Sequence, residues 1–277
     1  MKLIITMSGQ SARFTSAGYK EKSFIKVLDK YVIEHVVDMF DGLPHEDIYF
    51  IVRADDWYSQ TRLPELFPFC KVVPIKANLD GPVMSILSAN LDIHDHEEVI
   101  INYCDFAASW DFGQFLSHVR TENIQGCMTT HTGFHPHRLY NDSFAFIRND
   151  GTKILEVKEK ECFTDNFFEE HASNGTYYFS SFSIMNRYFN EQVALNDRTR
   201  GEFYVTMPFN LMIRDGLNVH LYETKNFMCF GTPRDIETIN AWSYILNQSG
   251  VCTANDLNSS AKYWGEMFYD IQQKLRS

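Results

Sequence analysis

The first half of the chain alternates short apolar runs with segments of helical spacing, and this alternation constrains the fold more than any other feature of the sequence. The runs and the helical segments that follow them are Leu3–Met7 with Val32–Phe40, Ile48–Val52 with Trp57–Leu66, Lys71–Pro74 with Val83–Ala89, and Val99–Cys104 with Phe112–Val119. This order predicts an α/β fold, with a mainly parallel mixed sheet flanked by helices on both faces. Ligands of such sheets bind beyond the carboxyl ends of the strands, so the loops after the four runs are expected to line one crevice. These loops open at Ser8, Arg53, Lys76 and Asp105.

Beyond Gly126 the pattern changes to shorter, β-rich pieces. Strands are predicted over Cys127–Thr130, Phe144–Ile147, Ile154–Val157, Tyr177–Phe179 and Val219–Tyr222, and helices over Val205–Arg214 and from Thr232 onward. A chain of 277 residues is near the upper size of one continuous domain, so residues 1–252 are interpreted as one domain with halves 1–125 and 126–252. Residues 253–277 carry the apolar stripe of an amphipathic C-terminal helix, an extension that either clamps onto the sheet or forms a homodimer contact.

The charge and the cysteine content exclude several classes of function. The formal net charge is −11, so the phosphates of nucleic acids and of anionic membranes are repelled on average, and neither is expected as a partner. The six cysteines include no Cys-x-x-Cys pair, which indicates reduced thiols rather than disulfides or a zinc site. No apolar run has the length of a signal peptide or a membrane span, so the expected location is cytoplasmic. Two histidine-rich stretches, His94–Glu98 and His135–Arg138, lack metal-ligand spacing and are interpreted as solvated loops.

The loop after the first apolar run has the composition of a polyphosphate-binding turn. Gly9 lies between Ser8 and Ser11, and its missing side chain lets backbone N–H groups approach phosphate oxygens. Arg13 and Lys22 follow, and their charges can neutralise a nucleoside triphosphate. One glycine is too few for a dinucleotide-binding loop, and the Gly-Lys-Ser/Thr of a P-loop is missing, so neither of those motifs is present.

The same segment, SGQSARF followed by GYKEKSFIKVLDKYVIEHVV, resembles the opening signature of the nucleotidyltransferases that make nucleotide sugars and related activated head groups. Further motifs follow in the order of that family: NYCD at 102–105, EK at 159–160, NGTYYF from 174, GEFY from 201 and GTPRDIE from 231. The resemblance covers most of the chain and is to MobA-like NTP transferase domains, in particular those of capsule and surface-polysaccharide pathways. It implies a Rossmann-like, GT-A-type fold.

The resemblance also implies the roles of individual residues. As candidate catalytic residues, Arg13 and Lys22 would contact the triphosphate, and Asp105 would bind Mg²⁺, the cofactor of the family. The implied nucleotide contacts are Ser8, Gly9, Ser11, Gly81 and Ser85, and the implied acceptor contacts are Glu159, Lys160, Asn174, Gly175 and Glu202. A divalent cation held by carboxylate is the usual means of bringing two phosphates together.

Two positions depart from the family pattern. Glu21 stands where the family usually has the proline before its lysine. Related enzymes often place a second metal-binding aspartate two residues before the glycine of the GT(P) motif, and this chain has Cys229 there. A thiol is a poor ligand for the hard Mg²⁺ ion. Either Asp105 and the substrate phosphates hold the metal with water, or another carboxylate such as Asp235 or Glu202 approaches in the fold.

The sequence therefore predicts a Mg²⁺-dependent nucleotidyltransferase that joins an NTP (CTP, UTP or GTP) to a phosphorylated sugar or related phosphoester and releases pyrophosphate, for surface-polysaccharide synthesis. Three alternatives stay open: a CTP-dependent cytidylyltransferase acting on a non-sugar phosphoester, a GT-A glycosyltransferase that uses a nucleotide sugar, and a degenerate, nonenzymatic nucleotide-binding protein. Such glycosyltransferases commonly carry Asp-x-Asp at the strand end, where this chain has Asp105, Phe106 and Ala107. Glu21 and Cys229 are the departures that favour the nonenzymatic alternative.

Overall fold

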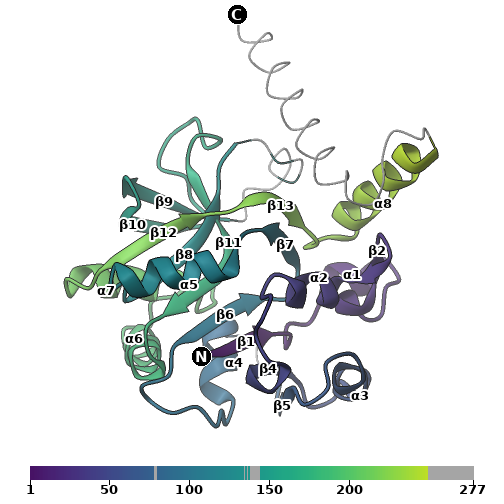
Figure 1. The fold of residues 1–277 in the computed structure, drawn as a ribbon, viewed down its shortest axis with the longest axis horizontal. Coiled ribbons are helices and arrows are strands. Elements are labelled where there is room, and N and C mark those ends of the chain that lie inside the picture. The colour runs from purple at the N-terminus through teal and green to yellow at the C-terminus, as the bar shows by residue number, and fades with distance from the viewer. Residues whose placement is uncertain (78–79, 134, 136, 138–143, 249–277) are drawn as a thin grey trace, which may run out of the picture.

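The computed structural model describes residues 1–77, 80–133, 135, 137 and 144–248, which form a nine-stranded mixed sheet flanked by helices (Figure 1). The strand order is β5-β4-β1-β6-β11-β8-β12-β10-β9. The strands are β1 (Lys2–Thr6), β4 (Ile48–Arg53), β5 (Lys71–Ile75), β6 (Val99–Tyr103), β8 (Gly126–His131), β9 (Ala145–Asp150), β10 (Lys153–Glu159), β11 (His171–Phe179) and β12 (Val219–Glu223). Two small antiparallel pairs accompany the sheet: β2 (Lys26–Val27) with β3 (Lys30–Tyr31), and β7 (Phe106–Ser109) with β13 (Lys225–Cys229).

The helices connect and cover these strands. They are α1 (Ala12–Ser16), α2 (Val32–Asp38), α3 (Trp57–Leu66), α4 (Pro82–Ser88), α5 (Phe112–Thr121), α6 (Phe182–Ala194), α7 (Pro208–Arg214) and α8 (Pro233–Gln248), with 3₁₀ turns η1 (Lys22–Phe24) and η2 (His45–Asp47). Among the described residues, none of the helices has the length and apolar character needed to cross a membrane.

Parallel pairing is concentrated in the first half of the chain. It links β5, β4, β1 and β6, which are the four strands predicted from the alternating pattern. β11 is antiparallel to both β6 and β8, and β12 returns parallel to β8. β9 pairs with both β10 and β11, so the strands of the second half close into a ring of pairings. The predicted α/β fold is confirmed, and its parallel part lies where the sequence pattern predicts it.

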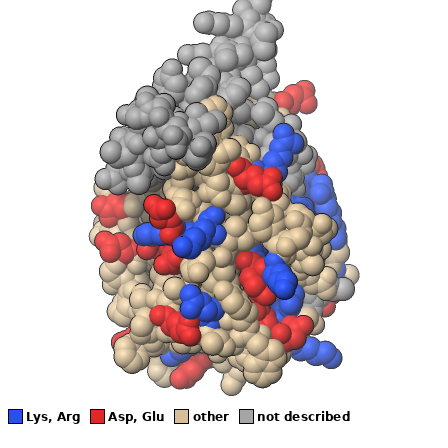
Figure 2. Space-filling model, turned by 90° about the vertical axis from the view of Figure 1, so that its right-hand side faces the viewer, with Lys and Arg blue, Asp and Glu red and all other residues tan. Residues whose placement is uncertain are grey.

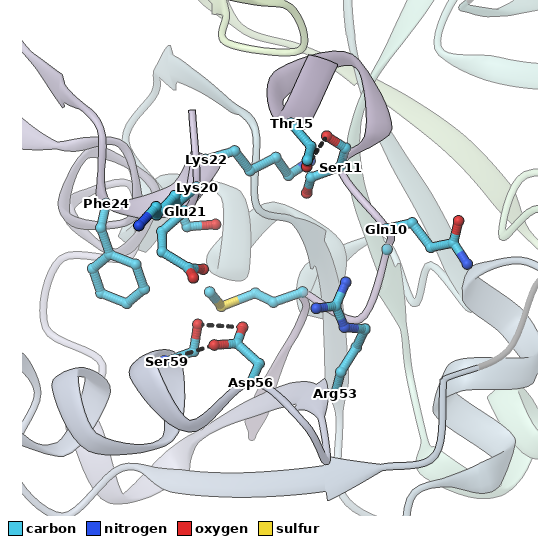
Figure 3. Close-up of a pocket in the computed structure, with 13 residues that line it drawn as sticks. Gln10, Ser11, Thr15, Lys20, Glu21, Lys22, Phe24, Arg53, Asp56 and Ser59 are labelled. Carbon is cyan, nitrogen blue, oxygen red and sulfur yellow. Dashed lines mark hydrogen bonds between the residues drawn. The ribbon is translucent and has the colours of Figure 1, made fainter. Parts of the chain in front are cut away.

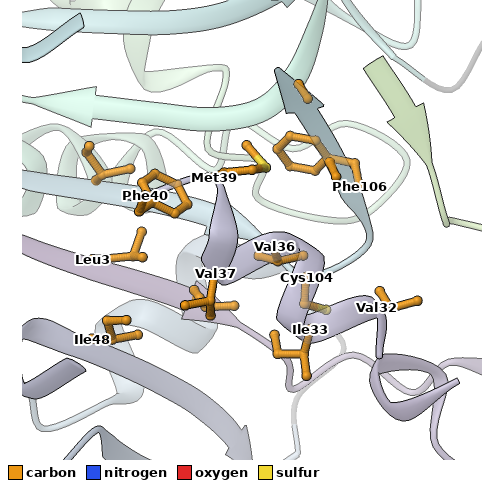
Figure 4. Packing of buried hydrophobic residues seen from close by; sticks show 14 of the residues in the cluster. Leu3, Val32, Ile33, Val36, Val37, Met39, Phe40, Ile48, Cys104 and Phe106 are labelled. Atoms are coloured by element: carbon orange, nitrogen blue, oxygen red, sulfur yellow. The ribbon is translucent and has the colours of Figure 1, made fainter. Parts of the chain in front are cut away.

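Two hydrophobic cores fill the space between the sheet and its helices, one on each face. Successive side chains of a strand point to opposite faces. Leu3 and Ile5 therefore belong to the core beneath α2 and α5, whereas Ile4 belongs to the core beneath α4, α6 and α7. Figure 4 shows the first of these cores, to which Val36 and Val37 of α2 and Leu3 of β1 belong. Because burial of each such side chain contributes about 1.5–3 kcal/mol, both cores hold the parallel strands and the loops that follow them in place.

Two elements differ from the prediction or lie beyond the described residues. The sequence prediction contains no helix at α6, whose first turn is capped by the Ser181 hydroxyl accepting from the Ile184 N–H at 3.2 Å. The helix predicted from Thr232 is α8. The predicted C-terminal helix at 253–277, and the homodimer contact considered for it, lie outside the described residues.

The surface carries charges of both signs. On the face shown in Figure 2, Lys and Arg side chains lie among Asp and Glu side chains instead of forming one continuous basic patch. Of the cysteines that the structure describes, Cys70, Cys104, Cys127 and Cys229 are free thiols.

Candidate active site

The adjacent parallel strands β1 and β6 bring Lys22 and Asp105 together. Thr6 pairs with Tyr103, so the loops that follow the two strands leave the same edge of the sheet. The Lys22 Nζ donates to the Asp105 Oδ2 at 2.9 Å. Burial alone lowers the pKa of Lys22, but the Asp105 carboxylate outweighs this effect and raises the pKa above its usual value. The structure therefore brings together Lys22 and Asp105, two of the three candidate catalytic residues.

A pocket opens between the first loop, residues 20–24 and the end of β4 (Figure 3). Its walls include Gly9 and Ser11, and space is open above Gly9, where an added Cβ would have no neighbour within 4 Å. Its charged lining residues are Lys20, Glu21, Lys22, Arg53 and Asp56. Burial raises the pKa of Glu21, and the negative charge of Asp56 raises it further. The loops after β1 and β4 thus share one crevice with cations on its walls, whereas Lys76 and Asp105, which begin the other two predicted loops, are not among the residues that line it.

A hydrogen-bond chain links Ser8 to the turn before α4. The Ser8 hydroxyl donates to the Ser85 hydroxyl at 2.8 Å, and Ser85 in turn donates to the Gly81 carbonyl at 3.3 Å. Gly81 has φ of 97°, and a Cβ at this position would lie 2.8 Å from the Phe203 carbonyl oxygen and 3.0 Å from the Glu202 Cβ. The close approach requires glycine. As a result Gly81, a predicted nucleotide contact before α4, lies directly against Glu202, a predicted acceptor contact in residues 126–252.

Glu159 and Lys160, at the end of β10, form a second polar cluster with residues 202–206. Thr206 donates from its hydroxyl to the Glu159 Oε2 at 2.6 Å. Burial raises the pKa of Glu159 to about 7, despite this hydrogen bond, and the nearby Glu202 carboxylate adds to the rise. The Lys160 ammonium donates to the Tyr204 hydroxyl and lies 3.9 Å from the centre of the Tyr204 ring. Burial lowers the pKa of Lys160. The site therefore holds a carboxyl and an amine whose charged forms are both disfavoured by burial.

Tyr204 and Thr206 also belong to this cluster, although the sequence prediction does not include them. Both follow Glu202 in the segment GEFYVT, so the GEFY motif was the available signal. Their contact with β10 depends on how α7 and the chain before it pack, which the motif does not show.

Electrostatic contacts connect the two halves of the site. Arg13, exposed on α1, lies close enough to Lys160 for its charge to add to the lowering of the Lys160 pKa. Burial raises the pKa of Tyr177, and the negative charges of Glu159 and Asp105 raise it further. Charged groups of the first half, Arg13 and Asp105, therefore act electrostatically on Lys160 and Tyr177 of the second half.

Asn174 and Gly175 lie inside β11, at an irregularity in its pairing with β8. The Asn174 side chain is buried, contacts the His131 Nδ1 through its Oδ1 at 2.5 Å and donates to the Thr224 hydroxyl at 2.6 Å. The Asn174 amide is therefore engaged by two other side chains of the protein, His131 and Thr224. Gly175 has φ of 112°, and a Cβ there would lie 2.9 Å from the Phe106 ring, next to Asp105. The structure thus brings Gly175 to the loop after β6 but directs the Asn174 amide elsewhere.

Cys229 lies beside Asp105 and meets two further potential ligands. It pairs with Phe106 across the β7–β13 ladder, and the Phe230 N–H donates to the Asp105 carbonyl at 2.8 Å. Of the two carboxylates considered from the sequence, Asp235 is the one that reaches Cys229, with Sγ and Oδ2 separated by 3.8 Å. The thiol pKa is raised well above its usual value by burial and by the Asp235 and Asp105 carboxylates.

The interpretation of the stretch 135–138 as a solvated loop is wrong for His137. Its side chain is buried, and its Nδ1 lies 2.9 Å from the Asp235 Oδ1. The two residues are 98 positions apart in the chain, so local metal-ligand spacing could not reveal them. Only the packing of α8 brings them together.

The residues at Asp105 fit Mg²⁺ better than those at Cys229. Asp105 offers a partly exposed carboxylate, an oxygen ligand of the kind that holds Mg²⁺ together with substrate phosphates. Cys229 offers a buried thiol whose raised pKa keeps it neutral. Neutral sulfur does not bind this hard ion, so the second family position is unsuited to Mg²⁺.

The sequence of residues 3–153 matches the family model of the MobA-like NTP transferase domain. The match includes both Lys22 and Asp105. The chain matches no curated protein sequence.

Solved nucleotidyltransferase structures share the fold. The chain superposes on the nucleoside-diphosphate-sugar pyrophosphorylase from Vibrio cholerae RC9 with a TM-score of 0.69 at 20% identity, covering 86% of this chain and 99% of that one. A proposed glucose-1-phosphate thymidylyltransferase from Bacillus anthracis gives 0.66 at 17% identity, covering 87% and 94%. The inositol-1-phosphate CTP transferase from T. maritima gives 0.64 at 11% identity, covering 94% and 96%.

Proposed function

The chain belongs to the family of MobA-like NTP transferase domains, and from this premise we propose that it transfers the nucleotidyl group of an NTP to a phosphorylated sugar or related phosphoester. The single observation that carries the proposal is the contact between the Lys22 Nζ and the Asp105 Oδ2 at 2.9 Å, beside the pocket that Gly9 and Ser11 line. A cation, a carboxylate and open backbone N–H groups are the components that a triphosphate and its counter-ion require.

On the nucleotide side, Lys22 and Arg13 neutralise the triphosphate, and Gly9 and Ser11 bring backbone N–H groups to its oxygens. The turn from Gly81 to Ser85 lies behind the loop and contacts the nucleobase. The support for this arrangement is the Ser8–Ser85 hydrogen bond, which holds that turn against the first loop.

Asp105 would hold Mg²⁺ together with the substrate phosphates, and the charge of the ion would reduce the repulsion between the two anionic reactants. Asp105 is suited to this role because its side chain is 31% exposed and because it lies just after β6, the strand that pairs with β1.

On the acceptor side, Lys160 and Arg13 attract the acceptor phosphate, and Glu159 and Glu202 accept hydrogen bonds from its hydroxyl groups. An acceptor phosphate oxygen forms a bond to the α-phosphorus while the bond from that phosphorus to the β-bridging oxygen breaks. The bonding electrons leave with pyrophosphate, and no covalent enzyme intermediate is needed. The support for placing the two substrates side by side is the close approach of Gly81 to Glu202 and Phe203.

The nucleobase and the acceptor are tested by a substrate panel. Thermal shifts with CTP, UTP, GTP and ATP in the presence of Mg²⁺ identify the nucleotide, because a bound ligand raises the melting temperature in proportion to its affinity. Pyrophosphate release is then measured with sugar 1-phosphates, inositol phosphate and phosphocholine. Release with CTP and a non-sugar acceptor would assign the cytidylyltransferase alternative, for which the fold likeness to the inositol-1-phosphate CTP transferase is the favouring observation.

We place the product in surface-polysaccharide synthesis and the protein in the cytoplasm, where NTPs are available.

Two results would overturn this proposal. Release of a nucleoside diphosphate from a nucleotide sugar, without pyrophosphate formation from NTPs, would identify a glycosyltransferase. Tight NTP binding with no pyrophosphate from any acceptor would identify a nonenzymatic nucleotide-binding protein.

A further inference from the structure

Three buried side chains of metal-binding type meet beside the active site. His137, Cys229 and Asp235 are 4%, 7% and 5% exposed, and each places one ligand atom within 4.8 Å of the other two. Their atoms are an imidazole nitrogen, a sulfur and a carboxylate oxygen. The three residues come from separate places in the chain: Cys229 ends β13, Asp235 lies in the first turn of α8, and His137 packs against both.

Hydrogen bonds orient two of the three groups. The Gly231 N–H donates to the Cys229 Sγ at 3.4 Å. Thr232 donates to the Asp235 Oδ2 from its N–H at 2.8 Å and from its hydroxyl at 2.6 Å. The His137 Nδ1 lies 2.9 Å from the Asp235 Oδ1 and 3.0 Å from its Oδ2. Metal ligands are typically held in this way by a surrounding set of donors.

We propose that His137, Cys229 and Asp235 form a binding site for one transition-metal ion, of which Zn²⁺ is the best fit. Ligand atoms around tetrahedral zinc lie about 3.3–3.8 Å apart, given metal–ligand bonds of about 2.0–2.3 Å. The observed Sγ–Oδ2 separation of 3.8 Å meets this range, and the His137–Asp235 contact needs to open by only a few tenths of an ångström. Mixed nitrogen, sulfur and oxygen ligands select zinc over magnesium.

The local charges favour a cation at this place. Asp235 and Asp105 both act electrostatically on the Cys229 sulfur, and a bound dication would convert the thiol to a thiolate and release its proton. The ion would join His137 to the junction between β13 and α8. A metal ion that binds only the folded chain stabilises the folded state. Binding at this site would therefore also stabilise the segment beside Asp105.

The proposal is tested on the full chain by metal content, which does not depend on nucleotidyl transfer. The protein is stripped with a chelator, incubated with Zn²⁺ and dialysed, and bound zinc is counted by mass spectrometry. We expect about one Zn²⁺ per chain and a higher melting temperature after loading. Loading with Co²⁺ instead should produce the near-ultraviolet absorption of a thiolate–cobalt bond.

The variants Cys229→Ser and His137→Gln should each weaken Zn²⁺ binding at least about tenfold in a competition titration with a chromophoric chelator. Cys229→Ser should also lose the cobalt absorption. Cys127→Ser, which removes a buried thiol outside the cluster, is the matched control and should retain both. A wild-type chain that retains less than about a tenth of an equivalent of zinc would overturn the proposal, and this measurement needs no variant to fold. A cobalt absorption that persists in Cys229→Ser would overturn it as well.

Discussion

The Lys22 ammonium lies 2.9 Å from the Asp105 carboxylate, and this ion pair joins η1, which follows α1, to the turn between β6 and β7. The side chains are 20% and 31% exposed, and Lys22 is the one of the two that lines the adjoining pocket. In the absence of substrate, each group is the other's counter-charge. Triphosphate oxygens and a divalent cation would give each a stronger partner, which makes this pair the place where substrate binding should begin.

The first prediction concerns this pair. Lys22→Ala and Asp105→Asn should each lower the rate of pyrophosphate release at least about 100-fold, because each removes a charge that opposes the charge of the reacting phosphates. Lys30→Ala is the control, since Lys30 forms an exposed ion pair with Asp38 at 2.5 Å and should leave the rate unchanged. Circular dichroism checks that each variant is folded. Rates within twofold of wild type in both Lys22→Ala and Asp105→Asn would remove these residues from the reaction.

The second prediction concerns the pH dependence of stability through Glu159. The pKa of this carboxyl is raised to about 7, so the protonated form stabilises the folded state at low pH. That contribution is fully present below the ordinary pKa of about 4.5 and is lost as the pH rises through 7. Glu159→Gln is neutral throughout, so relative to wild type it should gain up to about 3 kcal/mol in unfolding free energy between pH 4 and pH 8. Urea denaturation at several pH values measures the difference, and a constant difference would contradict the predicted pKa.

The third prediction concerns Gly81. An added Cβ would lie 2.8 Å from a backbone oxygen of Phe203, which cannot move without shifting the chain beside Glu202. Gly81→Ala should therefore cost about 2–3 kcal/mol of stability, combining steric overlap with an unfavourable positive φ. Gly18→Ala is the matched control, because Gly18 has a similar φ of 85° and no atom within 4 Å of an added Cβ. Equal losses in the two variants by urea denaturation would show that the contact with Phe203 is unimportant.

The fourth prediction concerns the hydrogen bond between Ser8 and Ser85. Removing either hydroxyl should destabilise the protein by about 1 kcal/mol, the usual net value of one buried hydrogen bond. In a double-mutant cycle with Ser8→Ala and Ser85→Ala, the second substitution should cost less once the first is present. The same single variants should weaken NTP binding in a thermal-shift titration, because the turn before α4 loses its anchor. Strict additivity in the cycle would show that the two side chains act independently.

The first half of the fold was predictable because its signals are local. Apolar runs at Leu3, Ile48 and Val99 alternate with helical spacing, and the rule that parallel strands end at one edge then predicts that Asp105 lies near the first loop. The predicted helix at Trp57–Leu66 coincides with α3. By contrast, α6 was missed, although its buried residues, such as Met185 and Phe189, are spaced as a helix requires.

Candidate residues of the second half could be selected from the sequence, but their surroundings could not. Glu159 and Lys160 were selected by motif, yet the raised pKa of the carboxyl arises from burial and from Glu202, more than forty positions away. Asn174 was selected by the same reasoning, and its amide is instead occupied by His131 and Thr224. A motif specifies which residue is present, whereas the direction of its side chain follows from the strand that carries it.

The sequence alone determined the alternation of the first four apolar runs with helices, the loop of small residues near the start and the carboxylate after the fourth apolar run, because each of these depends on neighbours within a few positions. The tertiary structure decided which distant groups meet: Lys22 with Asp105, Gly81 with Phe203, and His137 with Cys229 and Asp235. Periodicity specifies which face of an element is buried but not what packs against it. Contacts between residues 83 to 122 positions apart arise only when the sheet and its helices close around both cores.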